Sequence, residues 1–199
     1  MCLWFIEYNE KINRVIKHTK VENFDLLPSK LKLASLDNLK SDIDPNYIAL
    51  KKCLEAVKQN YDYVIIDCPH TFGYLTLNVL VAANTVLIPV QCEYFALAAV
   101  SQILASISKV QNTLNPNLSI EGFLLTMYDA KTNHDTEISS EVRGLFKEKT
   151  FSTQIPRNIS IPESNMKGEP VTTYRPNSFG AISYFSLARE VMDNERNED

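Results

Sequence analysis

The sequence predicts an α/β fold in which helices cover both faces of a mostly parallel sheet. Short apolar stretches typical of strands alternate with stretches of helical periodicity along most of the 199 residues, the pattern expected of strand–helix–strand units. Hydrophobic residues make up 45% and charged residues 22%, an ordinary globular composition. Because there is no internal repeat and no low-complexity linker, we predict a single domain over residues 1–199, with a polar tail at 193–199.

The predicted strands are apolar runs that stop at turn-forming residues. Pro28 ends the first run, and Cys68-Pro69 follows the second, in which Val64-Ile65-Ile66 leads to Asp67. Strands are expected at residues 23–27, 64–67, 85–90, 120–126, 151–156 and 171–174.

The predicted helices carry apolar residues three or four positions apart. Asp44-Pro45 is a helix start, since Asp is a favoured N-cap residue and Pro is tolerated at the first helical position. Further helices are expected after residue 67 to about 80 and over 181–192. The helix that starts at Asp44-Pro45 carries Tyr47, Leu50, Leu54 and Val57 on one apolar face. Two more helices are expected around the apolar faces formed by Val100, Ile103, Ile107 and Val110 and by Ile138, Val142 and Leu145.

Charge and cysteine content limit the class of protein. A net charge of −4 gives no general attraction to nucleic acid or anionic membrane, so any DNA contact requires a local basic patch. The four cysteines form no CxxC pair and lack the spacing of a zinc site. No apolar stretch reaches membrane-spanning length. Reduced thiols in a cytoplasmic protein are the expectation.

Asp67 is the first candidate for chemistry. Ligands of open α/β sheets bind beyond the carboxyl ends of the strands, where a carboxylate can orient the water shell of Mg²⁺ bound to a nucleotide. An apolar run followed by Asp is also a common helix cap or turn, so Asp67 alone does not decide between the two interpretations.

Four stretches together favour the nucleotide-site interpretation of Asp67. They are "YDYVIIDCP", "VLIPVQCEYFAL", "IEGFLLTMYDAKTN" and "IPRN", which occur in this order, each at a predicted strand end. From about Val21 to Met192 the chain closely resembles the ParA/Soj family of chromosome- and plasmid-partition ATPases, which have a deviant P-loop and are related to MinD. The resemblance implies a P-loop NTPase-like fold of the ParA/MinD type, ATP and Mg²⁺ as cofactors, and a nucleotide-dependent homodimer. It also implies a ParB-type partner, non-specific DNA contact and association with the nucleoid.

The resemblance also assigns site residues. Asp67 matches the Walker B aspartate, which holds Mg²⁺ through water. Met127 and the turn Pro156-Arg157-Asn158 match positions around the adenine base. A core methionine and a strand-ending turn are the alternatives for these two.

Lys131 matches a position, usually arginine, on a surface thought to contact DNA without sequence specificity. A lysine neutralises phosphate but lacks the bidentate fork, and a solvated surface lysine is the alternative. Ser160 and Phe179 stand where the family often has basic residues, so we expect weak DNA binding. The acidic end, "REVMDNERNED", does not fit a membrane-binding helix.

The phosphate loop of the family is absent from these residues. No GxxxxGK[ST] occurs, and none of the five glycines forms a glycine-rich turn before a helix. We therefore expect a chain that starts downstream of the family's first strand–P-loop–helix–strand unit and leaves the strand at 64–67 without a neighbour. A misplaced start, a frameshifted gene and a genuine short product all fit. ATP hydrolysis is expected to be lost.

Two functions remain open from the sequence. The chain is the C-terminal portion of a ParA-type ATPase, or it is a non-catalytic interaction module, or remnant, that binds a full-length ParA, a ParB-type partner or DNA.

Overall fold

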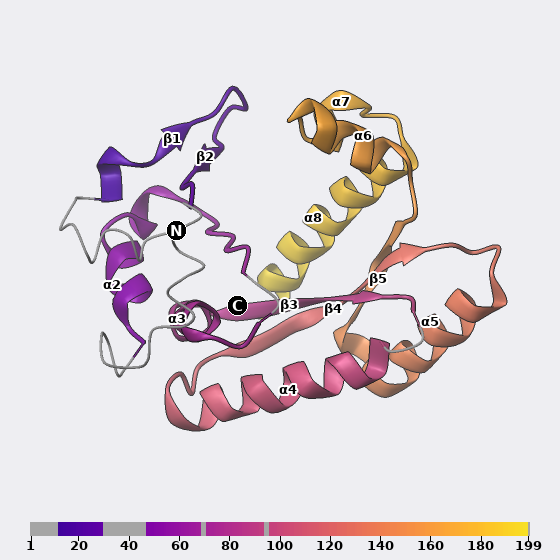
Figure 1. Cartoon of the computed structure of the whole chain (residues 1–199), viewed down its shortest axis with the longest axis horizontal. Coiled ribbons are helices and arrows are strands. Elements are labelled where there is room, and N and C mark those ends of the chain that lie inside the picture. Colours follow the sequence, from indigo (N-terminus) through magenta and orange to yellow (C-terminus); the bar gives the residue numbers. More distant parts are fainter. Residues whose placement is uncertain (1–11, 30–46, 69–70, 94–95, 199) are drawn as a thin grey trace. The chain divides into compact units, whose positions relative to one another are not determined.

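The computed structural model describes residues 12–29, 47–68, 71–93 and 96–198 (Figure 1). These residues form two compact units. The first contains the described residues up to 84 together with 105–118, and the second contains those at 85–104 and from 119 onward. The prediction of a single domain remains a prediction.

The first unit combines a small hairpin with two short helices. Strands β1 (Lys17–His18) and β2 (Asp25–Leu26) pair antiparallel. Around them lie η1 (Ile12–Arg14), α2 (Ala49–Glu55), η3 (Lys58–Asn60) and α3 (Tyr74–Ala82). The core consists of Ile12, Leu50, Val57 and Val79. Leu50 and Val57 are buried as their helical spacing predicts, while the predicted start at Asp44-Pro45 lies outside the described residues.

The prediction of a strand at residues 64–67 is wrong. Residues 61–68 are irregular chain and join neither sheet. Ile66 packs against the core of the first unit, but Ile65 is 92% exposed and Val64 is 44% exposed. A strand needs a partner for its backbone N–H and C=O groups, and the described residues provide none here. Val64 and Ile65 are therefore exposed, whereas Ile66 is packed.

The second unit contains the parallel sheet. Strands β3 (Thr85–Gln91), β4 (Ser119–Tyr128) and β5 (Thr150–Pro156) pair in the order β3-β4-β5, and both pairings are parallel. Helix α4 (Ala96–Thr113) connects β3 to β4, and α5 (Asn133–Phe146) with η4 (Lys147–Lys149) connects β4 to β5. The three strands match the predictions at 85–90, 120–126 and 151–156.

Helices cover both faces of this sheet (Figure 1). On one face, Leu124, Phe151 and Ile155 pack with Leu187 and Val191 of α8 (Phe179–Glu198). On the other, Phe123 stacks on Phe146 of α5 with 3.8 Å between ring centroids, and Gln154 donates a hydrogen bond to Ser139. Neighbouring strand residues point to opposite faces, so Phe123 packs against α5 and Leu124 packs against α8. The predicted fold class is confirmed.

A bulge in β5 is filled by a side chain from α8. Between its pairs with Phe123 and Leu125 of β4, β5 runs from Thr150 to Gln154, so residues 151–153 leave the ladder. Ser152 and Thr153 donate their backbone N–H groups to the two carboxylate oxygens of Glu190, at 2.5 and 2.9 Å. The carboxylate thus satisfies backbone groups that the bulge releases.

Several local predictions fail. Val171–Tyr174 is a helical turn, α7, and not a strand, because Pro170 begins it and accepts from Thr173 and Tyr174 through its carbonyl. Helix α6 (Ser160–Lys167) was not predicted. Leu145 is 60% exposed, unlike the other residues of its predicted stripe. The polar tail predicted at 193–199 stays a prediction; residues 193–198 belong to α8. Within the part of the chain that the structure describes, no helix is long and apolar enough to cross a membrane.

Candidate nucleotide site

The residues predicted around the adenine lie together at the carboxyl ends of β4 and β5. Tyr128 pairs with Pro156 in the strand register, and the Arg157 backbone N–H donates to the Tyr128 carbonyl at 3.0 Å. Met127 is 38% exposed and has a positive φ of 55°, which is uncommon for a residue other than glycine. The structure therefore brings Met127 and Pro156 to one edge of the sheet, where open α/β sheets bind ligands.

Asn158 turns the chain from β5 into α6. Its side-chain Oδ1 accepts a hydrogen bond from the Ser160 backbone N–H at 2.9 Å, and its carbonyl accepts from Ile161. The side-chain amide oxygen thereby satisfies one of the orphan N–H groups of the helix start. Asn158 is half-buried, whereas Arg157 beside it is exposed.

The loop between β4 and α5 is fixed by two aspartates and a threonine. Asp135 accepts from the Asp129 backbone N–H at 2.8 Å and donates its own backbone N–H to the Thr132 hydroxyl at 3.3 Å. A side-chain hydrogen bond between Thr132 and the Asp135 carboxylate, followed by the one from the Asp129 backbone and the nearby charges of His134 and Arg157, lowers the pKa of Asp135 from its ordinary value. Thr132 is the N-cap of α5. The Thr-x-x-acid spacing of a capping box could have predicted this network from the sequence.

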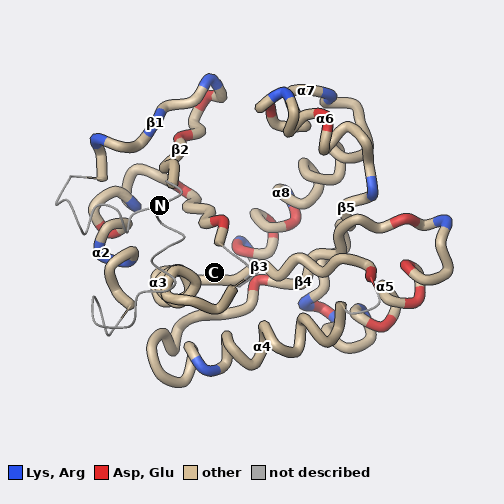
Figure 2. The backbone as a smooth tube through the Cα atoms, viewed as in Figure 1, with Lys and Arg blue, Asp and Glu red and all other residues tan. Residues whose placement is uncertain are grey.

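Lys131 lies in the same loop with its side chain exposed. Its backbone N–H donates to Asp129 at 3.0 Å, so the loop geometry does not depend on the ammonium group. Helix α5, which follows, carries acidic residues at three positions and one arginine, and Figure 2 shows acidic positions predominating along it. These acidic residues weaken the attraction of this surface for a phosphate backbone.

Asp67 belongs to the first unit, at the end of the irregular segment 61–68. Its side chain is exposed and forms no hydrogen bond or ion pair with the residues that the structure describes. A free carboxylate fits Mg²⁺, which takes one or two carboxylates and keeps several waters or phosphate oxygens. No group of three His, Cys, Asp or Glu side chains that could hold a metal occurs among the described residues, so Asp67 would act as a single ligand.

The predicted site residues thus fall in both units. Met127, Pro156, Arg157 and Asn158 form one group in the second unit, Lys131 lies in the loop after β4, and Asp67 is in the first unit.

Solved structures define the class of protein. The chain superimposes on cobyrinic acid a,c-diamide synthase from Mycobacterium smegmatis with bound ADP and magnesium with a TM-score of 0.80 and 30% identity, covering 98% of this chain and 72% of that one. It matches the fold of the cell division ATPase MinD from Pyrococcus furiosus with a TM-score of 0.74 and 23% identity, covering 94% and 73%. The chain therefore has the fold of a P-loop ATPase of the MinD type.

Sequence relatives narrow the class to a family. A family model described as an AAA domain matches residues 2–120. The sporulation initiation inhibitor protein Soj of Bacillus subtilis strain 168 is 47% identical over 180 residues, 90% of this chain and 71% of Soj. The chromosome-partitioning ATPase Soj of Treponema pallidum is 42% identical, covering 91% and 72%. The chromosome partitioning protein ParA of Myxococcus xanthus is 39% identical, covering 91% and 64%. The chain belongs to the ParA/Soj family.

Proposed function

We propose that this chain is the C-terminal portion of a ParA-type partition protein, cytoplasmic and associated with the nucleoid, that works with ATP and Mg²⁺. The observation that carries the proposal is the 47% identity to Soj over 90% of the chain. The grouping of Met127 with Pro156 and Arg157 at the carboxyl ends of two parallel strands supports it, because that edge of the sheet is where such folds bind ligands.

Each predicted residue has a role in this proposal. Asp67 holds Mg²⁺ through water, and the ion offsets charge on the nucleotide phosphates. Met127 supplies an apolar surface for the adenine base, and Pro156-Arg157-Asn158 shapes the same pocket from the end of β5. Lys131 contacts DNA phosphates. A homodimer and a ParB-type protein are the proposed protein partners.

The 199 residues by themselves are proposed not to bind ATP tightly or hydrolyse it. They contain no GxxxxGK[ST], so neither the nest of backbone N–H groups nor the lysine that neutralises phosphate is supplied. Contacts to adenine cannot replace charge-assisted phosphate contacts, which are roughly twice as strong as neutral ones. The same absence favours the second candidate, a non-catalytic module that binds a ParA, a ParB-type partner or DNA.

Calorimetry with MgATP separates the two candidates. The chain alone should show no binding in the micromolar range, whereas a fusion that adds the phosphate-loop segment of Soj should bind and hydrolyse ATP. Asp67→Ala should weaken MgATP binding to the fusion and abolish turnover. Asp62→Ala, an exposed aspartate of the same irregular segment, is the matched control and should change neither. Micromolar binding by the chain alone, lost in Asp67→Ala, would refute the proposed dependence on the phosphate loop. A fusion that folds but neither binds nor hydrolyses ATP would support the interaction module.

A further inference from the structure

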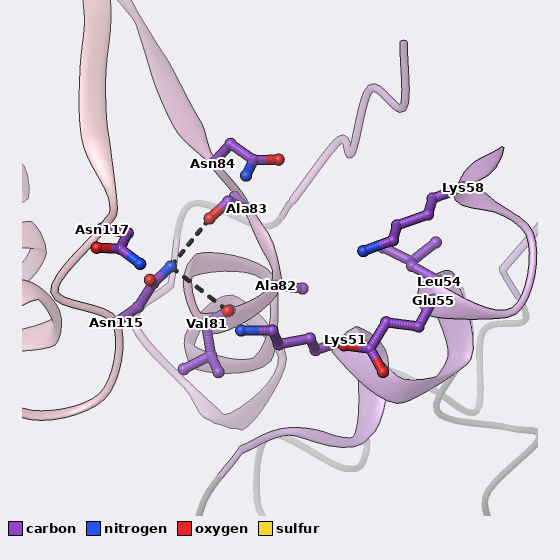
Figure 3. Close-up of a pocket in the computed structure, with 10 residues that line it drawn as sticks. All are labelled: Lys51, Leu54, Glu55, Lys58, Val81, Ala82, Ala83, Asn84, Asn115 and Asn117. Carbon is purple, nitrogen blue, oxygen red and sulfur yellow. Dashed lines mark hydrogen bonds between the residues drawn. The ribbon is translucent and has the colours of Figure 1, made fainter. Parts of the chain in front are cut away.

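A second pocket lies within the first unit, and none of the residues predicted for the nucleotide lines it. It is a cavity of about 140 Å³ between α2, the end of α3 and the turn at residues 115–117 (Figure 3). Its walls combine two lysines, one glutamate, three asparagines and an apolar floor. The lining residues are Lys51, Leu54, Glu55, Lys58, Val81, Ala82, Ala83, Asn84, Asn115 and Asn117.

Asn115 builds one wall of this pocket. The side chain is 9% exposed, and its amide nitrogen donates to the carbonyls of Leu80 and Ala83, both at 2.9 Å, and of Val81 at 3.4 Å. These are carbonyls that a helix leaves without a partner at its C-terminus. Asn115 therefore caps α3, and the capping does not require a lysine.

The ammonium groups of the two lysines have no partner in the part of the chain that the structure describes. Neither the Lys51 nor the Lys58 side chain forms an ion pair or a hydrogen bond there. Figure 3 shows both side chains extending from α2 and η3 toward the end of α3, so that their ammonium groups converge on the cavity. Glu55 also lines the pocket but lies beyond ion-pair distance of either lysine.

Size and charge together select the ligand. Drug-sized ligands and cofactors occupy pockets of about 300–1,000 Å³, so a cavity of about 140 Å³ favours a ligand smaller than a whole nucleotide. A single phosphate group is of a size that suits it. Two ammonium groups against one carboxylate leave a local charge of +1, and the side chains of Asn84 and Asn117 offer N–H donors beside them.

We propose that this pocket binds a phosphate-type oxyanion, with Lys51 and Lys58 neutralising its charge and the amides of Asn84 and Asn117 donating hydrogen bonds. Lysine suits such a ligand as a compact point charge. Glu55 limits the affinity by repulsion, which predicts weak, millimolar binding. The ligand is either free phosphate or the phosphate group of a small ester, and it binds independently of the nucleotide site proposed above.

Nuclear magnetic resonance of the full chain tests this site, with inorganic phosphate and glycerol 1-phosphate as probes at constant ionic strength. The side-chain amide signals of Asn84 and Asn117 should shift saturably. Binding of both probes assigns a site for phosphate esters, and binding of inorganic phosphate alone assigns a site for the free ion. Lys51→Met or Lys58→Met should weaken binding about tenfold, the order expected for one lost charge-assisted hydrogen bond. Glu55→Gln should strengthen it.

Lys52→Met is the matched control, because Lys52 is exposed on the same helix and does not line the cavity. It should leave the affinity unchanged. The methionine variants keep most of the side-chain length and remove the ammonium group, with its charge and its N–H donors; because Lys51 and Lys58 are exposed, we expect the variants to fold. The proposal is overturned by a linear response to both probes, by saturable shifts that persist in the Lys51→Met/Lys58→Met double variant, or by an equal loss in Lys52→Met.

Discussion

Removing the carboxylate of Glu190 should destabilise the second unit by an amount far above that of an ordinary surface substitution. The side chain accepts two hydrogen bonds from the bulged backbone of β5, at Ser152 and Thr153. A hydrogen bond to a charged group contributes about 1.5–3 kcal/mol. Glu190→Gln keeps one acceptor oxygen but turns an NH₂ group toward the other backbone donor. We expect a loss of about 2–4 kcal/mol in the free energy of unfolding.

The same contact predicts a pH dependence. Burial raises the pKa of Glu190, but the hydrogen bonds from Thr153 and Ser152 together outweigh it, so the pKa lies below 4.5. A group with a lowered pKa in the folded state stabilises the fold above its unfolded pKa, and this stabilisation is lost as the pH falls through the folded value. The difference between wild type and Glu190→Gln should therefore be full at pH 7 and shrink below about pH 4.3.

Urea melts of the two proteins at pH 7 and in the acid range measure both effects. Glu141→Gln on the exposed side of α5 is the control, since substitutions at such positions change stability by about 0.5 kcal/mol or less. A Glu190→Gln change no larger than that of Glu141→Gln would show that the bulge does not depend on the carboxylate.

Three further predictions rest on single residues. Gly122→Ala should lower the free energy of unfolding by about 1–3 kcal/mol, because the new Cβ would lie 2.7 Å from the Phe151 ring and 2.8 Å from the Lys149 carbonyl. Gly144→Ala is the control, because there is open space around Gly144, and it should be neutral or stabilising in the same urea melt. Cys92 is buried, and burial with the nearby Asp135 raises its pKa to about 11, so native-state thiol labelling should reach it after Cys53 and Cys68; labelling as fast as that of the unfolded chain would contradict this. DNA binding should be weak and steeply salt-dependent, and Lys131→Ala should lower it at low salt where Lys109→Ala does not; equal effects would remove Lys131 from the interface.

The three paired strands could be predicted from the sequence because each is an apolar run that ends at turn residues. The role of Met127 and Pro156 around an adenine base comes from the family resemblance and stays a prediction. That the two residues lie close together follows from the fold, since parallel strands end at one edge of the sheet.

The sequence predictions of secondary structure failed where a proline set the local backbone conformation. Val171 and its neighbours have β-branched and aromatic side chains, yet Pro170 begins a helical turn there, and strand propensity depends strongly on context. Helix α6 was missed because it contains Pro162, which lies in the first turn, where a missing N–H costs nothing.

The oxyanion pocket could not be predicted at all. It depends on Asn115 reaching the end of α3, a contact between residues more than thirty positions apart. No local sequence pattern around Lys51 or Lys58 predicts the contact of Asn115 with α3. Two lysines on a short helix and the turn after it are typical of a solvated surface.

The proposed function requires residues 64–67, which are irregular in this chain, to become a strand when the neighbouring strand of a ParA-type sheet is supplied, so that Asp67 meets the phosphate loop. Amide hydrogen exchange over residues 64–67 tests it directly, in the chain alone and in the fusion with the phosphate-loop segment of Soj. In the chain alone, where this run is irregular and Ile65 is 92% exposed, exchange should be fast. In the fusion it should slow by about a hundredfold or more, which corresponds to a local opening free energy of about 2.8 kcal/mol. Equal exchange in the two proteins, whether fast or slow, would contradict the claim.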